Sequence, residues 1–599
     1  MRGLKRPRHL EYLPTMVMLG FCALSILVLV SRIQIVDERF GSIMGMRREF
    51  ALAVLRHDSV ILGLLLACLI PALVLRSRIL GFLFKAGSLL VLLFYLSDLL
   101  VFRVFNLRLF VEDILIYGLD TKSVLFMASS VLGSAGELLL PIVLLSLVGA
   151  LLSFLLLPLK SFPRLLAGMS AMVLVFAVIA VAAPDLSGAN AWVVENVLEV
   201  NRPNGLARPY GPEKTARALN GSCLGEVDTV LPDPPGDGRP DIILVLFESL
   251  SLYQTRLFSE TRDIVPRFDS ITRRGTAFTD FFSNGFNTDD GLIALLTGIP
   301  PLPTTTMINT GDRGGFDGFF GISDSLPRRL RDMGYHTVFV TSGDLDFSMK
   351  GQWLLSIGFD QILGHDEPYF NGMERYHFLS VTDRALYENI IYNVLPDLQG
   401  SRPYFLVIEN VSTHHPFWEP ETGSTKEEEV FRYADTQLGW LYDNLEAEGF
   451  LRDGLLIITS DHRSMTPLRS EEFGRFRDEA RARIPLVFLG RGQEPGRVVE
   501  GYFQQTDLPA SVLHLLGEEA PLSGMRGNLL SNPPVPSRYV IYYGGQERDK
   551  VWVFGEDGTW SIRLDGDRTE FLQNRPSDGD SVLDFVNCVR IQAEARNGR

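Results

Sequence analysis

The stretch that decides the fold is Asp-Ile-Ile-Leu-Val-Leu-Phe-Glu at residues 241–248, an unbroken apolar run closed by a carboxylate. A short apolar run between polar ends is typical of a strand that is buried on both faces of a sheet. Four more runs of this kind follow, at residues 337–341, 405–408, 455–459 and 485–489. Helical patterns lie between them at residues 325–333 and 430–449. This alternation predicts an α/β domain whose mainly parallel sheet is covered by helices on both faces.

Turn-forming residues mark the limits of this domain. Residues 186–240 are rich in Gly, Pro and Asn and are predicted to be a linker. The α/β domain is predicted over residues 241–530, followed by a small antiparallel subdomain at residues 531–599. The subdomain is expected to contain strands at residues 539–543, 551–554 and 559–564, with Asp557-Gly558 as a hairpin turn.

Polar side chains follow three of the predicted strands. Glu248 ends the first strand, residues 412–415 (Ser-Thr-His-His) follow the third, and Asp461-His462 follows the fourth. Ligands of an open α/β sheet bind outside the carboxyl ends of its strands. We therefore expect these side chains to gather at one edge of the sheet.

A fourth polar element, residues 287–290 (Asn-Thr-Asp-Asp), stands directly before an apolar helical run at residues 291–296. Taken alone, a Thr before a helix is usually an N-cap, and an Asp-His pair after a strand is usually a feature of the loop. Taken together, carboxylate, imidazole and hydroxyl oxygen are the ligands of a hard or borderline divalent cation. We therefore predict a metal site made of Glu248, Thr288, Asp461 and His462.

Such a site supports phosphoryl chemistry on Thr288. A bound cation would lower the pKa of the hydroxyl and make it a nucleophile. The attacked phosphoryl group would lie at the helix N-terminus, whose free N–H groups favour anions. His414 is predicted to protonate the departing alcohol or to hold the phosphate. Two half-reactions through a phospho-Thr intermediate give group transfer when an acceptor alcohol outcompetes water.

The first 185 residues differ in composition from the rest of the chain. They carry a net charge of +6, whereas the remaining residues carry −21. Five apolar stretches of about the length that spans a bilayer lie in this region, at residues 13–30, 60–75, 79–101, 138–157 and 165–183. Buried helices of a soluble protein would have to lack charge in all five stretches by chance. The sequence therefore predicts an α-helical membrane domain with five spans at residues 1–185.

Basic residues set the expected orientation of these spans. The cluster at residues 2–8 and the short basic loops at residues 76–78 and 160–164 are expected in the cytoplasm. Five crossings then place everything after residue 183 on the extracytoplasmic side. The segment at residues 32–58 is expected to be an outer loop and opposes this orientation, because it contains five Arg.

The polar residues near the spans are predicted to lie at the membrane interface. Residues 103–122 are expected to form an interfacial helix rather than a further crossing. Asp98 and Glu137 lie near the ends of spans, so we expect them at the membrane interface rather than in a proton relay.

Charge and cysteine content exclude other classes of protein. The strongly acidic second part argues against nucleic acid as a partner, because phosphate backbones require clustered Lys and Arg. Four cysteines are too few for a disulfide scaffold or a thiolate zinc fold. Cys223 and Cys588 both fall in the external part and are expected to pair if the compartment is oxidising.

These motifs resemble those of the lipoteichoic acid synthases and related phosphoglycerol transferases, in which a sulfatase-like domain of the alkaline phosphatase superfamily follows five N-terminal spans. The resemblance covers nearly the whole chain and is most specific over residues 241–517. Residues 246–249 resemble the first metal-ligand motif, residues 287–290 the nucleophile loop, and residues 460–462 the paired metal ligands.

The resemblance also implies substrate-binding residues. Lys350 takes the place of an Arg that contacts substrate in the family, and Asp290 matches a family acid two residues after the nucleophile position. The segment at residues 413–417 is similar to the one whose His contacts substrate, which we place on His414, and His415 replaces an aromatic residue there. Arg463 stands where many relatives carry Gly. The residues assigned to substrate binding are Lys350, His415, Asp290 and Arg463.

The function implied by this resemblance is transfer of glycerol phosphate from phosphatidylglycerol, outside the bacterial cell membrane, to a lipoteichoic-acid-like polymer, a glycolipid or a glucan. The implied cofactor is a divalent metal, first of all Mn²⁺, and Mg²⁺ or Zn²⁺ also fits the ligands. Two alternatives stay open: a phosphoethanolamine transferase of the same superfamily, and a catalytically silent membrane-anchored sensor. A sulfatase is disfavoured, because its nucleophile is a modified Cys or Ser whereas residue 288 is Thr.

Overall fold

The computed structural model describes residues 8–41, 45–75, 77–105, 107–111, 163–186, 191–201, 209–224, 229–231, 238–304, 321–400, 402–415, 417–466, 468–545, 547 and 549–597. The chain forms two compact units. The first consists of residues 1–202 with 467–470, and the second consists of residues 203–466 and 471–599.

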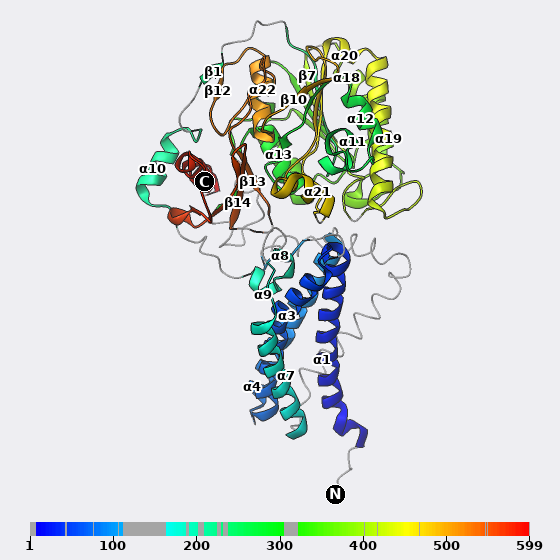
Figure 1. Ribbon diagram of the computed structural model, residues 1–599. Helices are drawn as coiled ribbons and strands as arrows, with labels where there is room; N and C mark the ends of the chain where they lie inside the picture. The colour runs from blue at the N-terminus through cyan, green and yellow to red at the C-terminus, as the bar shows by residue number, and fades with distance from the viewer. Residues whose placement is uncertain are drawn as a thin grey trace. The chain divides into compact units, whose positions relative to one another are not determined.

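Long apolar helices make up the first unit (Figure 1). They are α1 (Arg8–Val36), α3 (Arg47–Val74), α4 (Arg78–Phe105) and α7 (Pro163–Ala182). Helix α3 packs against the other three. Two short helices follow, α8 (Ala191–Val194) and α9 (Val197–Val200).

Among the described residues, three helical segments are long and apolar enough to cross a membrane: Leu19–Val36, Arg47–Val74 and Arg78–Arg103. The fifth predicted span corresponds to α7, whose apolar part Leu166–Ala182 is shorter. The fourth predicted span, Glu137 and most of the predicted interfacial helix at residues 103–122 lie outside the described residues. The structure therefore supports a helical membrane domain, and five spans remain a prediction.

The prediction of a loop at residues 32–58 was wrong. Helix α1 continues to Val36, a π-helical turn follows at Asp37–Gly41, and α3 begins at Arg47. The two charged residues at the limits of this segment neutralise each other inside the helices. Buried Arg32 forms an ion pair with buried Asp58, which also accepts a hydrogen bond from the Tyr95 hydroxyl.

Asp98 is also paired inside the first unit. Its side chain is 1% exposed and lies 2.7 Å from the Arg108 guanidinium. Arg108 and Arg32 both donate to the backbone carbonyl of Glu195, just after α8. The two ion pairs therefore hold the segment that leaves the helices.

The second unit is built on an eight-stranded mixed sheet in the order β10-β3-β9-β8-β2-β7-β5-β6. Its strands are β2 (Ile242–Leu246), β3 (Thr276–Phe278), β5 (His336–Thr341), β6 (Gln361–Leu363), β7 (Tyr404–Glu409), β8 (Leu455–Thr459), β9 (Leu486–Gly490) and β10 (Arg497–Val499). All five predicted strands are present. The sheet is parallel in most of its pairs but mixed, because β9 is antiparallel to both β8 and β3. An apolar run indicates that a strand is buried but carries no information about its direction.

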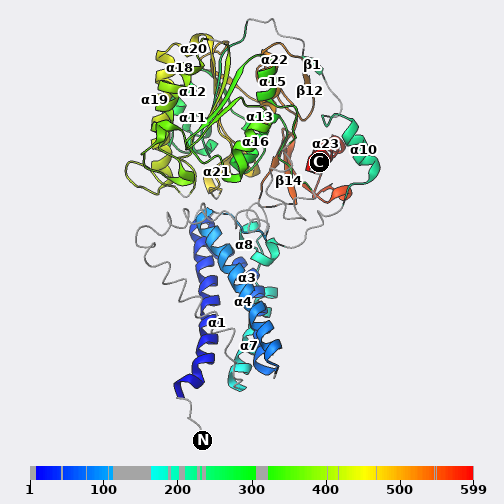
Figure 2. The same ribbon diagram turned by 180° about the vertical axis from the view of Figure 1, so that it is seen from behind.

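Alternate residues of the central strand β2 face two separate cores. Ile243 and Val245 belong to the core that includes residues of α12 (Pro266–Thr272) and α19 (Glu427–Ala447). Ile242 and Leu244 belong to the core that includes residues of α13 (Thr288–Thr297) and α15 (Leu326–Asp332). Helices therefore cover both faces of the sheet, as expected (Figures 1 and 2). This makes β2 apolar at every position.

Shorter elements complete the α/β part. They are β4 (Phe281–Phe282), β11 (Phe503–Gln504), α11 (Arg256–Ser259), α16 (Lys350–Ser356), α17 (Asp383–Asn389), α18 (Leu395–Leu398), α20 (Phe450–Asp453), α21 (Ser470–Phe476) and α22 (Leu508–Leu515).

The C-terminal residues form the predicted antiparallel sheet. Its strands are β13 (Val540–Tyr543), β14 (Lys550–Gly555), β15 (Gly558–Arg563) and β16 (Glu570–Phe571). A helix that was not predicted, α23 (Gly579–Asn597), follows them, and its residues Val582 and Val586 share an apolar core with the strands.

The stretch predicted as a linker carries more structure than its composition suggests. Helix α10 (Pro212–Asn220) packs against α23. Cys223, just after α10, forms a disulfide with Cys588 of α23. Strand β1 (Thr229–Leu231) pairs with β12 (Ala520–Leu522).

Candidate active site

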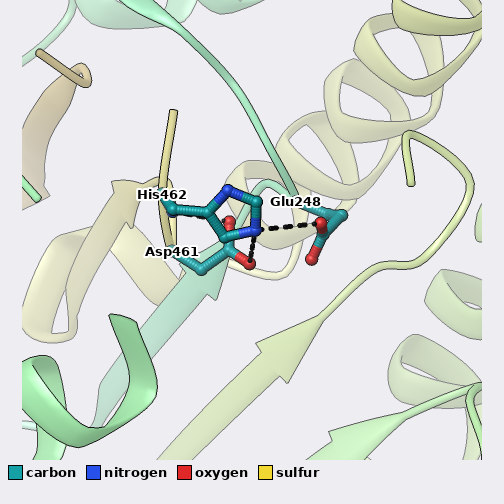
Figure 3. Close-up of side chains that lie close together, drawn as sticks. All are labelled: Glu248, Asp461 and His462. Atoms are coloured by element: carbon teal, nitrogen blue, oxygen red, sulfur yellow. Dashed lines mark hydrogen bonds and ion pairs between the residues drawn. The ribbon is translucent and has the colours of Figure 1, made fainter. Parts of the chain in front are cut away.

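Three ionisable side chains meet where β2 and β8 end (Figure 3). These strands are parallel neighbours, so Glu248 after β2 comes close to Asp461 and His462 after β8. The Nε2 atom of His462 lies 3.4 Å from Oε1 of Glu248 and 3.3 Å from Oδ2 of Asp461. All three residues are buried, with exposures of 3%, 0% and 0% for Glu248, Asp461 and His462.

The hydrogen bonds of this group fit a bound cation. Nδ1 of His462 lies 2.8 Å from the carbonyl oxygen of Arg463, so Nδ1 is the nitrogen that carries hydrogen in neutral imidazole. The lone pair of Nε2 then points at two carboxylates, and Oδ2 of Asp461 has no hydrogen-bond partner in the part of the chain that the structure describes. Buried acceptors that face one another repel unless positive charge lies between them. A divalent metal ion satisfies this arrangement, and an outer hydrogen bond such as the one from Nδ1 is typical of metal-binding His.

The pKa values reflect the same crowding of negative charge. Burial acts to lower the pKa of His462, but Asp461 and Glu248 outweigh it and raise the pKa to about 9. Burial and the neighbouring Glu248 raise the pKa of Asp461 to about 7. The group thus draws positive charge to itself, which a proton on His462 or a metal ion supplies.

Backbone and amide contacts hold the carboxylates in place. Ser249 adopts a left-handed conformation with φ 60°, and its N–H donates to Oδ1 of Asp461 at 2.9 Å. The N–H of Glu248 donates to the side-chain oxygen of Asn410 at 2.7 Å. The Gln505 amide donates to the carbonyl of Asp461 at 2.5 Å. A strained non-glycine residue such as Ser249 is typical of a functional site.

Thr288 lies beside this group at the start of α13. Its Oγ1 is 3.3 Å from Oε2 of Glu248 and 3.4 Å from Nε2 of His462. The helix is capped by Asn287, whose side-chain oxygen accepts the N–H of Asp290 at 2.9 Å. Gly291, in the first turn of α13, allows the close approach, because a Cβ there would lie 2.0 Å from the carbonyl oxygen of Asp461.

Lys350 forms an ion pair with a residue that the sequence analysis did not single out. Its Nζ lies 2.9 Å and 3.0 Å from the two carboxylate oxygens of Glu409, the last residue of β7. Asp289, next to Thr288, interacts electrostatically with both. Burial raises the pKa of Asp289 to about 7, with Lys350 opposing this effect.

His414 is enclosed close to the site. Its ring packs edge-on against Phe378 at a centroid distance of 4.7 Å. Burial, reinforced by the charges of His377 and His462, lowers the pKa of His414 to about 3, so the imidazole is neutral at physiological pH. Its Nδ1 has no hydrogen-bond partner among the described residues.

The other three predicted residues have different surroundings. His415 packs edge-on against Phe417 at 5.2 Å. Burial raises the pKa of Asp290 to about 7, and Asp290 accepts the N–H of Phe286 at 3.3 Å. Arg463 donates to both oxygens of Glu472, at 2.7 Å and 2.9 Å.

The sequence analysis did not predict a role for four residues that interact with the site. They are Asn410, Gln505, Asp289 and Glu409, which interact with Glu248, Asp461, Lys350 and Lys350, respectively. The rule that selected Glu248 also applies to Glu409, because both residues stand at the carboxyl end of a parallel strand. No local pattern indicates that Gln505 reaches the loop at residue 461.

Comparisons with known proteins identify a matching family model and several relatives. Residues 240–518 match the family model described as Sulfatase. Phosphoglycerol transferase I of Xanthomonas campestris pv. campestris (strain B100) is 25% identical over 338 residues, which is 53% of this chain and 47% of the relative. Phosphoglycerol transferase I of Escherichia coli (strain SMS-3-5 / SECEC) is 25% identical over 336 residues, which is 52% of this chain and 42% of the relative. The match thus spans just under half the length of these curated relatives.

A solved structure shows the same fold. A protein in the alkaline phosphatase superfamily from Vibrio parahaemolyticus aligns with a TM-score of 0.50 and 18% sequence identity, covering 66% of this chain and 98% of that chain. This likeness shows the fold, and the family model and the curated relatives support the resemblance seen in the motifs.

Proposed function

Residues 240–518 match the family model described as Sulfatase, and from this premise we propose that the protein is a membrane-anchored, metal-dependent phosphoglycerol transferase with Thr288 as nucleophile. The observation that carries the proposal is the position of Thr288 Oγ1, within 3.4 Å of both Glu248 and His462. A hydroxyl this close to buried carboxylates and an imidazole lone pair has the surroundings of an activated nucleophile.

Glu248, Asp461, His462 and Thr288 would hold the metal ion, with Mn²⁺ proposed first and Mg²⁺ or Zn²⁺ also suited to the ligands. When bound, such an ion lowers the pKa of the Thr288 hydroxyl and offsets negative charge on the phosphoryl group. Thr288 is the first residue of α13, so it lies at the helix N-terminus, where free N–H groups favour an anionic substrate.

The reaction proceeds in two displacements. In the first, Thr288 Oγ1 loses its proton and bonds to phosphorus, the phosphorus–oxygen bond to diacylglycerol breaks, and the diacylglycerol oxygen takes up a proton. In the second, an acceptor hydroxyl loses its proton and bonds to the phosphorus of phospho-Thr288, the bond to Thr288 Oγ1 breaks, and Oγ1 takes up a proton. Each half-reaction breaks one phosphate ester bond and makes another, so no further reactant is required.

His414 is proposed to hold the phosphate through a hydrogen bond. Because burial keeps its imidazole neutral in the free protein, it offers an N–H donor rather than a ready proton. An incoming phosphate would favour the charged form of His414 and bring it closer to the acid that the first displacement requires.

The donor is proposed to be phosphatidylglycerol, and the acceptor an extracytoplasmic polymer, glycolipid or glucan. Apolar N-terminal helices place the protein at a membrane, where a phospholipid donor lies. The Cys223–Cys588 disulfide favours an oxidising compartment for the second unit.

Turnover of labelled phosphatidylglycerol with Mn²⁺ tests the proposal. Wild type should release diacylglycerol and Thr288→Ala should not. Thr297→Ala should keep wild-type turnover, because the hydroxyl of this Thr, at the other end of α13, bonds backbone groups of Ile293 and Ile299 and no residue of the site. Equal turnover by wild type and Thr288→Ala would reject the nucleophile.

Mass spectrometry of the trapped protein identifies the transferred group. The proposal requires a glycerol-phosphate adduct on Thr288. An ethanolamine-phosphate adduct would instead establish the phosphoethanolamine transferase. A protein with no adduct and no turnover with either donor would be the silent sensor.

A further inference from the structure

A buried ion pair on the strand next to the metal ligands has no role in the mechanism so far. Lys350 Nζ binds both oxygens of Glu409, at 2.9 Å and 3.0 Å, and the two side chains are 13% and 3% exposed. Glu409 ends β7, the direct neighbour of β2 that carries Glu248. The pair therefore lies at the same edge of the sheet as the candidate active site.

The ammonium of Lys350 interacts with residues of the candidate active site. Besides Glu409, the anions that interact with its ammonium are Asp289, next to the nucleophile, and Glu248. Two hydrogen bonds join the ammonium to Glu409, and it makes no other hydrogen bond to a described residue. An ammonium has three N–H donors, so the third is available to a ligand oxygen.

The backbone before Lys350 is held in an unfavourable conformation. Ser348 and Met349 both adopt left-handed φ values, 53° and 54°, although neither is Gly. Phe347 packs against Phe378 at a centroid distance of 4.9 Å, and the N–H of Gly351 donates to the carbonyl of Leu345 at 2.8 Å. Such conformations persist only where surrounding contacts impose them, and they concentrate at functional sites. The local structure is thus arranged to deliver Lys350 to this place.

A lysine at a phosphate site lacks two properties of arginine. Its ammonium is a point charge on a flexible stem, and it loses its proton more readily when buried, whereas arginine is planar and always charged. Glu409 supplies both properties, since its two oxygens fix the position of Nζ. Burial acts to lower the pKa of Lys350, but Glu409 and Asp289 outweigh it and raise the pKa.

We propose that Glu409 is a positioning residue, which holds Lys350 charged and oriented so that its free N–H binds the phosphate of the substrate. The inference rests on the proposed function, because it takes the ligand of Lys350 to be the phosphate ester that Thr288 attacks. The opposite role for the same pair is that Glu409 masks Lys350 and weakens anion binding.

Binding of inorganic phosphate to the Mn²⁺-loaded full-length protein in detergent distinguishes the two roles without turnover. Positioning predicts that Glu409→Gln weakens phosphate binding about tenfold or more, as expected for loss of an oriented charged hydrogen bond. Masking predicts equal or tighter binding, because a negative charge has been removed, and this result would overturn the proposal.

The double variant supplies a readout that a structural role would not change. In a Lys350→Arg background, Glu409→Gln should weaken phosphate binding less than about threefold, because arginine needs no help to stay charged. If Glu409→Gln weakened phosphate binding equally in both backgrounds, Glu409 would have only a structural role, and the proposal would be rejected. Asp269→Asn is the matched control, since Asp269 is a buried carboxylate that accepts only the N–H groups of Arg256 and Leu257. It should leave phosphate binding unchanged.

Donor kinetics separate failure of this inference from failure of the proposed function. If wild type transfers glycerol phosphate, Glu409→Gln should raise KM for the donor and lower kcat/KM about tenfold or more in the Lys350 background only. If wild type does not transfer but the phosphate measurements show the predicted coupling, the proposed function fails and the role of Glu409 stands. If wild type transfers and the coupling is absent, only the role of Glu409 fails.

Discussion

Replacing Gly291 by Ala tests the contact on which the whole site depends. A Cβ at this position would lie 2.0 Å from the carbonyl oxygen of Asp461 and 2.7 Å from its carbonyl carbon, and separations under 3.0 Å are essentially never found. Helix α13 and the loop that carries Asp461 must therefore move apart by about 1 Å. The overpacking should cost about 1–3 kcal/mol of stability. Since Thr288 lies on α13 and its metal-binding partners on the loop, a 1 Å displacement should lower kcat/KM about 100-fold.

The assay combines turnover of labelled phosphatidylglycerol, metal content by mass spectrometry and thermal unfolding. Gly474→Ala is the matched control, because a Cβ there meets nothing within 4 Å inside α21. It should keep wild-type turnover and gain up to about 1 kcal/mol of stability, as Ala does over Gly in a helix. Wild-type turnover and metal content in Gly291→Ala would show that α13 and the Asp461 loop do not touch, and would remove the basis for Thr288 as nucleophile.

Three further predictions follow from buried carboxylates. Asp461→Asn should lose metal and turnover together, because it removes a charge that holds the cation, and full metal content in the variant would contradict the ligand role. Asp507→Ala should lower the free energy of unfolding by about 3 kcal/mol or more, since it orphans the N–H groups of Gln504 and Gly527; an unchanged melting temperature would refute this. Burial raises the pKa of Asp435 to about 7, above its unfolded value near 4. Its contribution to stability should therefore fall as pH rises from about 4 to about 7, and Asp435→Asn should flatten the pH dependence of unfolding over that range; parallel pH profiles would count against it.

Much of the α/β fold could be predicted because its central strands are continuous apolar runs. Strands β2, β5, β7, β8 and β9 all fall on such runs. The strands of the eight-stranded sheet that were not predicted are β3, β6 and β10. Each has three residues, and three residues are too few to show a hydrophobic period. Pattern alone therefore finds the middle of a sheet better than its edges.

In the first unit, the position of the helix ends could not be predicted where it depends on contacts between residues far apart in the sequence. Arg32 was predicted to start a loop because the first apolar stretch ends at residue 30. Its partner Asp58 stands 26 residues further along the chain, and only the fold brings the two together. Charge in a sequence indicates a helix end only when no such partner is available.

The same limit applied to the candidate site. Its four proposed metal-binding residues were found because each follows a predicted strand or precedes a predicted helix. Glu409 also stands at the end of a strand, but its meaning depends on Lys350, 59 residues away. The position of a side chain follows from secondary structure, whereas its partner follows from tertiary packing.

The disulfide between Cys223 and Cys588 joins two residues that are 365 positions apart in the sequence, so it closes most of the second unit into a covalent loop. The bond links helix α10, near the start of this unit, to helix α23, near its end. Neither helix can therefore separate from the other and start local unfolding while the disulfide is intact. We expect that a fragment produced by cleavage of the chain before α10 would stay folded without the apolar helices. For the same reason, a fragment beginning near residue 209 should be produced in an oxidising compartment, where the covalent loop can close.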